Sequence, residues 1–100
     1  MNPQEPAVVH EPDHKRFRLQ IGSHTAYTEY IRAGNRIVFS HTEVPPPLEG
    51  QGVASRLART ALDYARAEGL RVMPLCPFVA GFIRRHPEYK DLLQAGFRVD

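Results

Sequence analysis

The segment HTEVPPPLEGQGVAS, residues 41–55, decides the fold, because the chain changes there from a strand to a helix. The preceding residues, Arg36–Val44, are rich in β-branched and aromatic side chains and predict a strand. Pro45-Pro46-Pro47 ends that strand, since proline has no backbone N–H to donate. The following residues, Gly52–Glu68, have apolar side chains at helical spacing and stop at Gly69, which favours the left-handed conformation after a helix.

The predicted helix is amphipathic, and its apolar stripe is rich in alanine. Small side chains let a helix approach a sheet closely. A further strand, Leu70–Leu75, follows at once, and a strand–helix–strand unit of this kind implies a parallel crossover. The stripe consists of Val53, Ala54, Leu57, Ala58, Ala61, Leu62 and Ala65.

Three stretches that precede the strand Arg36–Val44 predict further strands. Ala7–His10 is short and apolar and suits an edge strand. Arg16–Ile21 and Ala26–Arg32 alternate between apolar and polar residues, which is typical of half-buried strands. Ala33-Gly34-Asn35 is a hairpin signal. Connections this short indicate an antiparallel meander.

Alternation along Arg36–Val44 predicts which side chains share a face of the sheet, because successive residues of a strand point in opposite directions. It places the titratable residues His41 and Glu43 beside apolar ones. The two predicted faces are Ile37, Phe39, His41 and Glu43, and Val38, Ser40, Thr42 and Val44.

The last third of the chain predicts a second, shorter helix. Cys76-Pro77 ends the strand, and Phe78–Arg85 follows as a helix with Phe78, Phe82 and Ile83 inward. Glu88–Leu93 adds one more helical turn. The predicted fold class is therefore α+β, a mixed sheet in which an antiparallel meander feeds a strand–helix–strand crossover with two main helices. It forms a single domain over residues 7–100 after a flexible tail at residues 1–6.

The composition limits the classes of function. The net charge is only +2, and the basic residues are spread out rather than gathered in the stripe that nucleic-acid binding needs. No stretch reaches the ~20 apolar residues of a membrane span, and Met1–His14 does not read as a signal peptide. One cysteine and five histidines without ligand-like spacing predict no disulfide and no metal site. We expect a cytoplasmic protein that binds neither nucleic acid nor a membrane.

The turn that contains Gly50 and Gly52 is a candidate phosphate site. Glycine lets the backbone approach a ligand, and the first amides of the following helix have no partner within the helix. These amides and the helix dipole favour phosphate or pyrophosphate. A tight turn without a ligand explains the same glycines. The P-loop and dinucleotide-binding patterns do not fit, because the required lysine and third glycine are missing.

The residues Glu49-x-x-Gly52-x-Ala54 before an amphipathic helix resemble motif A of the GNAT N-acetyltransferase superfamily. The longer run of residues 41–55, the segment Pro74-Leu-Cys-Pro-Phe78 and the segment His86-Pro-Glu-Tyr89 are similar to its small, single-domain YjdJ-type branch. The resemblance covers about residues 17–93. It departs from the wider pattern at Glu49, where the superfamily has Gln or Arg. Because a carboxylate beside a pyrophosphate is unfavourable, we expect Glu49 to turn outward or to pair with an arginine.

This resemblance implies a site for acetyl-CoA between two splayed parallel strands. The pyrophosphate would lie on the amides of Gln51–Ser55, and the pantetheine arm would run along the end of Arg36–Val44. The helices that form an acceptor pocket in longer relatives are missing, so the acceptor stays open. The implied CoA-binding residues are Val44, Gly50, Gln51, Gly52, Val53, Ala54, Ser55, Cys76 and Phe78.

His41, Glu43 and Cys76 are the candidate catalytic residues. Acetyl transfer needs a base for the amine proton, and His41, or Glu43 through a water, suits this role. Cys76 would protonate the leaving thiolate or accept the acetyl group itself. Each also has a plainer interpretation: a half-buried histidine, a solvated carboxylate and an inert buried thiol. Tyr89 is interpreted as packing, although many relatives protonate CoA with a tyrosine in this region.

The function that these residues predict is an acetyl-CoA-dependent N-acetyltransferase, in which acetyl-CoA is the acyl donor and no metal takes part. Its partners would be acetyl-CoA or CoA and a small-molecule or protein amine. The alternatives are a non-catalytic module that binds CoA or acetyl-CoA, and a structural domain whose glycine turn binds nothing.

Overall fold

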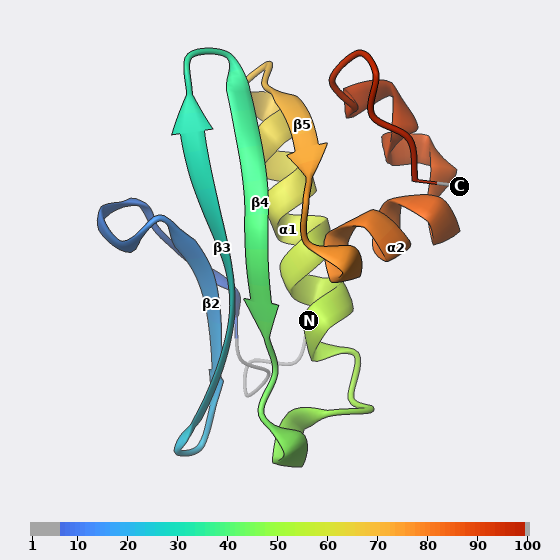
Figure 1. The fold of residues 1–100 in the computed structure, drawn as a ribbon. Coiled ribbons are helices and arrows are strands. Elements are labelled where there is room, and N and C mark those ends of the chain that lie inside the picture. The colour runs from blue at the N-terminus through green and yellow to red at the C-terminus, as the bar shows by residue number, and fades with distance from the viewer. Residues whose placement is uncertain (1–6, 100) are drawn as a thin grey trace.

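The computed structural model describes residues 7–99, so the predicted tail at residues 1–6 lies outside the described residues. Five strands form one sheet in the order β1-β2-β3-β4-β5 (Figure 1). The strands are β1 (Val9–Glu11), β2 (Arg16–Ile21), β3 (His24–Ala33), β4 (Arg36–Glu43) and β5 (Arg71–Pro74).

The order of the strands confirms the predicted meander and crossover. β1 to β4 pair in antiparallel fashion, each with its neighbour in the chain, and β4 pairs in parallel with β5. Helix α1 (Val53–Ala67) connects these two parallel strands. The first strand lies at Val9–Glu11 rather than at Ala7–His10, because its limits are set by pairing with β2, where Val9 lies opposite Arg18 and Glu11 opposite Arg16.

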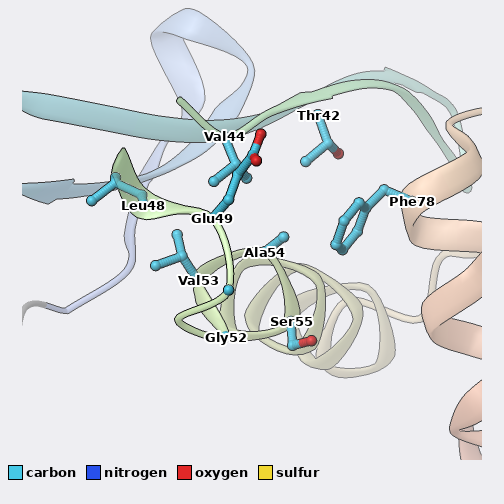
Figure 2. Close-up of a pocket in the computed structure, with 10 residues that line it drawn as sticks. Thr42, Val44, Leu48, Glu49, Gly52, Val53, Ala54, Ser55 and Phe78 are labelled. Carbon is cyan, nitrogen blue, oxygen red and sulfur yellow. The ribbon is translucent and has the colours of Figure 1, made fainter. Parts of the chain in front are cut away.

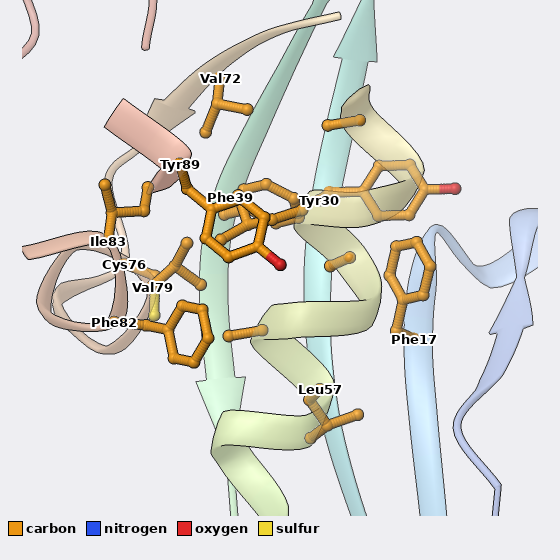
Figure 3. Packing of buried hydrophobic residues seen from close by; sticks show 14 of the residues in the cluster. Phe17, Tyr30, Phe39, Leu57, Val72, Cys76, Val79, Phe82, Ile83 and Tyr89 are labelled. Atoms are coloured by element: carbon orange, nitrogen blue, oxygen red, sulfur yellow. The ribbon is translucent and has the colours of Figure 1, made fainter. Parts of the chain in front are cut away.

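One buried cluster joins the sheet to the helices (Figure 3). All seven residues of the predicted apolar stripe of α1 are buried. Helix α2 (Pro77–Arg85) packs beside α1, with the Arg59 guanidinium 5.5 Å from the centroid of the Phe82 ring. The six-residue 3-10 helix Pro87–Leu92 follows and buries Tyr89 and Leu92.

Phe78 departs from the prediction that it faces inward. It is 41% exposed, whereas Phe82 and Ile83 are fully buried as expected. The buried stripe of α2 is centred on Val79, Phe82 and Ile83, which are spaced three and four residues apart. This spacing leaves Phe78 in the first turn at the flank of the stripe.

A bulge in β4 changes the alternation of its side chains. Glu29 of β3 pairs with His41, but the next residue, Tyr30, pairs with Phe39, so Ser40 is an extra residue in β4. An extra residue of this kind resets which face the following side chains occupy.

Beyond the bulge, the predicted faces of β4 are therefore wrong. Thr42 pairs with Thr28, which is 1% exposed, and so lies on the face that the helices cover. His41 and Glu43 pair with Glu29 and Tyr27 and lie on the opposite face, not beside the buried apolar residues of β4.

The face that carries His41 and Glu43 is covered by no helix in the part of the chain that the structure describes. We call it the open face. Its side chains are half-buried or exposed, and Ile31 is 53% exposed there. Leu75, just after β5, is 60% exposed. None of the helices within residues 7–99 is long and apolar enough to cross a membrane.

Candidate active site

A cavity of about 460 Å³ lies between the end of β4, the loop that follows it and the beginning of α1 (Figure 2). The loop includes the short 3-10 helix Pro46–Leu48. Apolar side chains form much of the wall. The lining residues are Thr42, Val44, Leu48, Glu49, Gly50, Gly52, Val53, Ala54, Ser55 and Phe78.

On the side of α1, the cavity is bordered by the backbone of the first turn of the helix. Gly52 precedes α1 in the left-handed conformation with φ 73°, and no side chain caps the first turn. Gly50 also has a positive φ, of 78°. A Cβ at either glycine would meet no atom within 4 Å, so the space beside the turn is open. The amides of Val53, Ala54 and Ser55 are thus available to an anion.

The parallel strands part at the same place. Their pairing runs from Arg36 opposite Arg71 to Phe39 opposite Pro74, and the Cys76 amide then donates to the Phe39 carbonyl at 2.9 Å. β4 continues beyond this point to Glu43 without a β5 residue opposite it. A strand edge that is free in this way can pair with the amides of an extended ligand.

Cys76 lies immediately beside this opening but does not line the cavity. It precedes α2 and is only 4% exposed. Its Sγ donates to Thr42 Oγ1 at 3.2 Å, and Thr42 Oγ1 also shares a hydrogen bond of 2.8 Å with Thr28 Oγ1. Thr42 lines the cavity, so it connects the thiol to the cavity wall.

His41 and Glu43 lie on the open face, in the part of β4 that extends beyond its pairing with β5. Their side chains contact each other, with His41 Nε2 3.6 Å from Glu43 Oε2. The Tyr27 hydroxyl donates to Glu43 Oε2 at 2.6 Å. This hydrogen bond, and a further one from His41, lower the pKa of Glu43, and the same contact with Glu43 raises the pKa of Tyr27.

The structure brings together most of the residues predicted to bind CoA. Gln51 is not among the lining residues, since its Nε2 donates to the Pro47 carbonyl at 2.8 Å and ties the loop together. Cys76 reaches the cavity only through Thr42. The predicted residues that line it are Val44, Gly50, Gly52, Val53, Ala54, Ser55 and Phe78.

Sequence analysis missed Thr42, Leu48 and Tyr27. Thr42 was assigned to the wrong face, and Leu48 stands in a loop without periodicity. Tyr27 of β3 lies opposite Glu43 of the neighbouring strand β4, and this contact could be predicted only if the register of the two strands were known. Glu49 was expected to turn outward or to pair with an arginine. It is exposed, but it also lines the cavity.

Tyr89 packs as the sequence indicates. It is 5% exposed, and its hydroxyl donates to Asp63 Oδ1 at 2.7 Å and accepts from Arg59 at 3.2 Å. It does not line the cavity. Within residues 7–99, no three His, Cys, Asp or Glu side chains are grouped so that they could hold a metal ion.

The sequence matches a known family over most of its length. The family model described as GCN5-related N-acetyl-transferase matches residues 16–92, which include all the lining residues of the cavity. The chain belongs to this family.

Similar proteins agree with this assignment. Protein NATD1 of Bos taurus is 36% identical over 92 residues, which cover 87% of this chain and 81% of the relative. Protein NATD1 of Homo sapiens is 34% identical with the same two coverages. A GCN5-like protein of Staphylococcus aureus, solved by NMR, has the same fold, with a TM-score of 0.68, 24% identity and coverage of 94% of this chain and 91% of that one. These matches confirm the predicted mixed sheet and superfamily.

Proposed function

We propose that this protein is an acetyl-CoA-dependent N-acetyltransferase that passes an acetyl group to an amine. The observation that carries the proposal is the cavity, which joins an uncapped helix N-terminus to a free strand edge. A thioester on a phosphorylated pantetheine arm needs both features. Its phosphate suits the helix amides, and its amides suit the strand edge.

The donor would lie on the helix side of the sheet. The amides of Val53, Ala54 and Ser55 would bind phosphate, and the apolar walls formed by Val44 and Phe78 would contact the pantetheine arm. The bulged end of β4 would then hold the thioester at the parting of the strands. A lone cysteine that stays reduced fits a cytoplasmic protein, where acetyl-CoA is available.

The acceptor amine would approach from the open face. Its nitrogen attacks the thioester carbonyl carbon, the carbon–sulfur bond breaks, and the acetyl group remains on nitrogen. The amine proton passes to a base, and the departing thiolate takes up a proton. Glu43, ionised and held by Tyr27, is our candidate for the base, and His41 is the nearest alternative on the same face.

Cys76 is our candidate for the proton donor to the thiolate. Its Sγ–H points at Thr42, whose hydroxyl borders the cavity, so a proton would travel through Thr42. The same thiol would have to move out of its buried position to become an acyl carrier, which makes direct transfer the simpler route.

Isothermal titration of acetyl-CoA tests the donor site. We expect micromolar binding to the wild type and its loss in Gly52→Glu, because a carboxylate there would occupy the open space beside the helix amides. Gly34→Glu is the matched control. Gly34 has a similar φ of 60° and open space around it, but it lies in the β3–β4 turn. Wild-type protein that binds no acetyl-CoA would refute the proposal.

A CoA-binding module without catalysis is the second candidate. The observation in its favour is that neither His41 nor Glu43 lines the cavity. Tight acetyl-CoA binding without transfer to any member of a broad panel of small amines and lysine peptides would favour it over the transferase.

A further inference from the structure

Glu49 places a negative charge in the wall of the proposed donor cavity (Figure 2). It stands four residues before α1, beside the turn whose amides face the cavity. It was expected to turn outward or to pair with an arginine. In the described part of the chain it forms no ion pair, and it lines the cavity.

No positive charge in the cavity wall balances this carboxylate. Of the ten lining residues, Glu49 is the only charged one. Attraction for a phosphate therefore comes from the helix N-terminus, equivalent to roughly half an elementary charge. The full negative charge of Glu49 opposes this attraction, and because Glu49 is exposed, its effect depends on the salt concentration.

The remaining residues of the cavity wall are uncharged and favour contact with an uncharged portion of a ligand. Val44, Leu48, Val53 and Phe78 offer apolar surface to a pantetheine arm, and the volume of about 460 Å³ lies in the usual range of small-molecule sites. CoA carries a pyrophosphate and, on its ribose, a further phosphate with up to two more negative charges. Each additional phosphate brings repulsion from Glu49 without a lysine or arginine of the wall to offset it.

We propose that Glu49 sets the donor specificity of this site, so that it selects acyl-pantetheine donors with few phosphate charges. Acetyl-dephospho-CoA and acetyl-phosphopantetheine then bind at least as tightly as acetyl-CoA. This inference rests on the proposed function, since it concerns the same donor cavity. Glu49 acts here as a specificity residue and takes no part in proton transfer.

The test is a titration of four donors that differ in phosphate charge: neutral S-acetyl-pantetheine, acetyl-phosphopantetheine, acetyl-dephospho-CoA and acetyl-CoA. Each is titrated into the wild type, Glu49→Gln and Glu68→Gln. Glu68 is the matched control, because it is an exposed glutamate at the far end of α1, about 20 Å along the helix.

In the wild type we expect acetyl-CoA to bind no more tightly than acetyl-dephospho-CoA. In Glu49→Gln we expect acetyl-CoA to bind roughly three- to tenfold more tightly, with no change for S-acetyl-pantetheine, and a smaller gain at high salt. Glu68→Gln should match the wild type with every donor.

Two results would overturn the inference while leaving the donor site intact. One is a wild type that binds acetyl-CoA measurably more tightly than acetyl-dephospho-CoA, which would mean that a positive group binds the ribose phosphate. The other is a Glu49→Gln variant that changes the affinity of all four donors equally. A wild type that binds none of the four would instead refute the proposed function itself.

Discussion

Tyr27 holds Glu43 on the open face, and this contact decides how the proposed base titrates. In Tyr27→Phe the hydrogen bond to Glu43 is lost, so the pKa of Glu43 rises toward its usual range. Because a base acts when deprotonated, we expect the acidic limb of the pH profile of kcat/KM to move to higher pH. Steady-state kinetics over a pH series measures this shift.

Tyr64→Phe is the control for that experiment, since the Tyr64 hydroxyl accepts from Arg32 on the other side of the sheet from Glu43. It should leave the acidic limb in place. If the limb is also unchanged in Tyr27→Phe, Glu43 is not the base, and His41 becomes the candidate.

His10 makes the stability of the fold depend on pH. Its ring stacks on Phe17 with centroids 4.2 Å apart, and its Nε2 hydrogen-bonds the Tyr30 hydroxyl at 2.6 Å. Burial lowers the pKa of His10, and Glu68 opposes this only in part. The unfolded chain therefore binds a proton more readily than the folded one. Keeping His10 neutral and buried therefore contributes fully to the free energy of unfolding above about pH 6.5. That contribution is lost as the pH falls through the folded-state pKa of His10.

Urea unfolding between about pH 7 and pH 5 measures this effect. We expect the free energy of unfolding to fall less in His10→Gln than in the wild type over this interval. His24→Gln, which changes an exposed histidine at the start of β3, should follow the wild type. A wild type and a His10→Gln variant with parallel profiles would show that His10 is not the responsible group.

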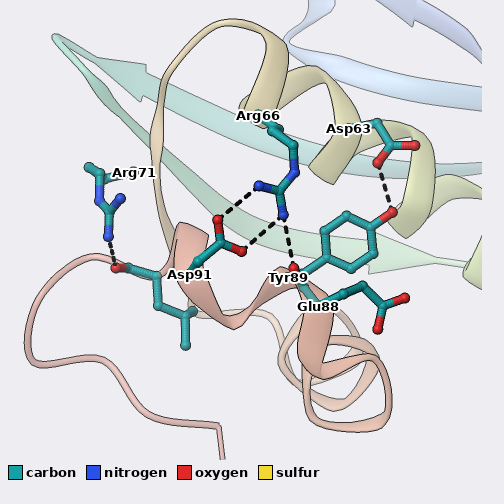
Figure 4. Close-up of polar contacts among 7 residues, drawn as sticks. Asp63, Arg66, Arg71, Glu88, Tyr89 and Asp91 are labelled. Carbon is teal, nitrogen blue, oxygen red and sulfur yellow. Dashed lines mark hydrogen bonds and ion pairs between the residues drawn. The ribbon is translucent and has the colours of Figure 1, made fainter.

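At the scale of elements, a polar contact attaches the 3-10 helix Pro87–Leu92 to α1 (Figure 4). Tyr89 donates to Asp63, and Arg66 donates to Asp91 at 2.8 and 2.9 Å and to the Glu88 carbonyl at 2.9 Å. The Arg66 hydrogen bonds lower the pKa of Asp91. Asp63 and Arg66 of α1 thus hold the 3-10 helix in place, and its Tyr89 and Leu92 belong to the buried cluster.

Removing the Tyr89 hydroxyl tests this attachment. We expect Tyr89→Phe to lower the free energy of unfolding by about 1 kcal/mol, because the largely buried hydroxyl loses its bond to a carboxylate. Urea denaturation of the variant beside Tyr27→Phe, whose hydroxyl bonds a carboxylate at an exposed position, measures the difference. Equal unfolding midpoints for the two variants would contradict the role given to Tyr89.

The helices and strands also show which parts of the fold could be predicted from the sequence alone. The α1 stripe, the parallel crossover and the glycine turn follow from local patterns that the sequence displays, namely helical spacing, a proline stop and positive-φ residues. The faces of β4 do not, because Ser40 is extra only relative to a strand that lies ten residues away in the chain. Strict alternation then assigns His41, Thr42 and Glu43 to the wrong faces.

The cavity was partly predictable, because some of its residues are close together in sequence and others are not. Gly50, Gly52 and the first turn of α1 adjoin one another in sequence, so the resemblance to a known motif could name them. The contact of Cys76 with Thr42 and that of Tyr27 with Glu43 span 34 and 16 residues. Such contacts depend on register and on how the strands part, which no local pattern encodes.

At the scale of the whole molecule, the sheet separates two sides with different chemistry. The helix side holds the cavity with its amides and apolar wall. The open face holds Glu43, His41 and Tyr27 and is covered by no helix within residues 7–99. The part of β4 beyond Phe39 has no β5 residue opposite it and borders both sides of the sheet. A thioester bound there from the helix side would also be accessible to an amine on the open face.

This two-sided arrangement favours a ternary complex over a covalent acetyl-enzyme. We expect initial-velocity lines that intersect when acetyl-CoA and an amine are varied together, because both substrates bind before transfer. Cys76→Ala should keep measurable turnover, with kcat reduced by about a hundredfold if Cys76 supplies the thiolate proton through Thr42. A covalent route requires the opposite: parallel lines, no turnover in Cys76→Ala, and wild-type protein heavier by one acetyl group after incubation with acetyl-CoA alone, as read by intact mass. Since the Cys76 side chain is 4% exposed and donates its hydrogen bond to Thr42, the thiol would first have to leave both its buried position and that partner.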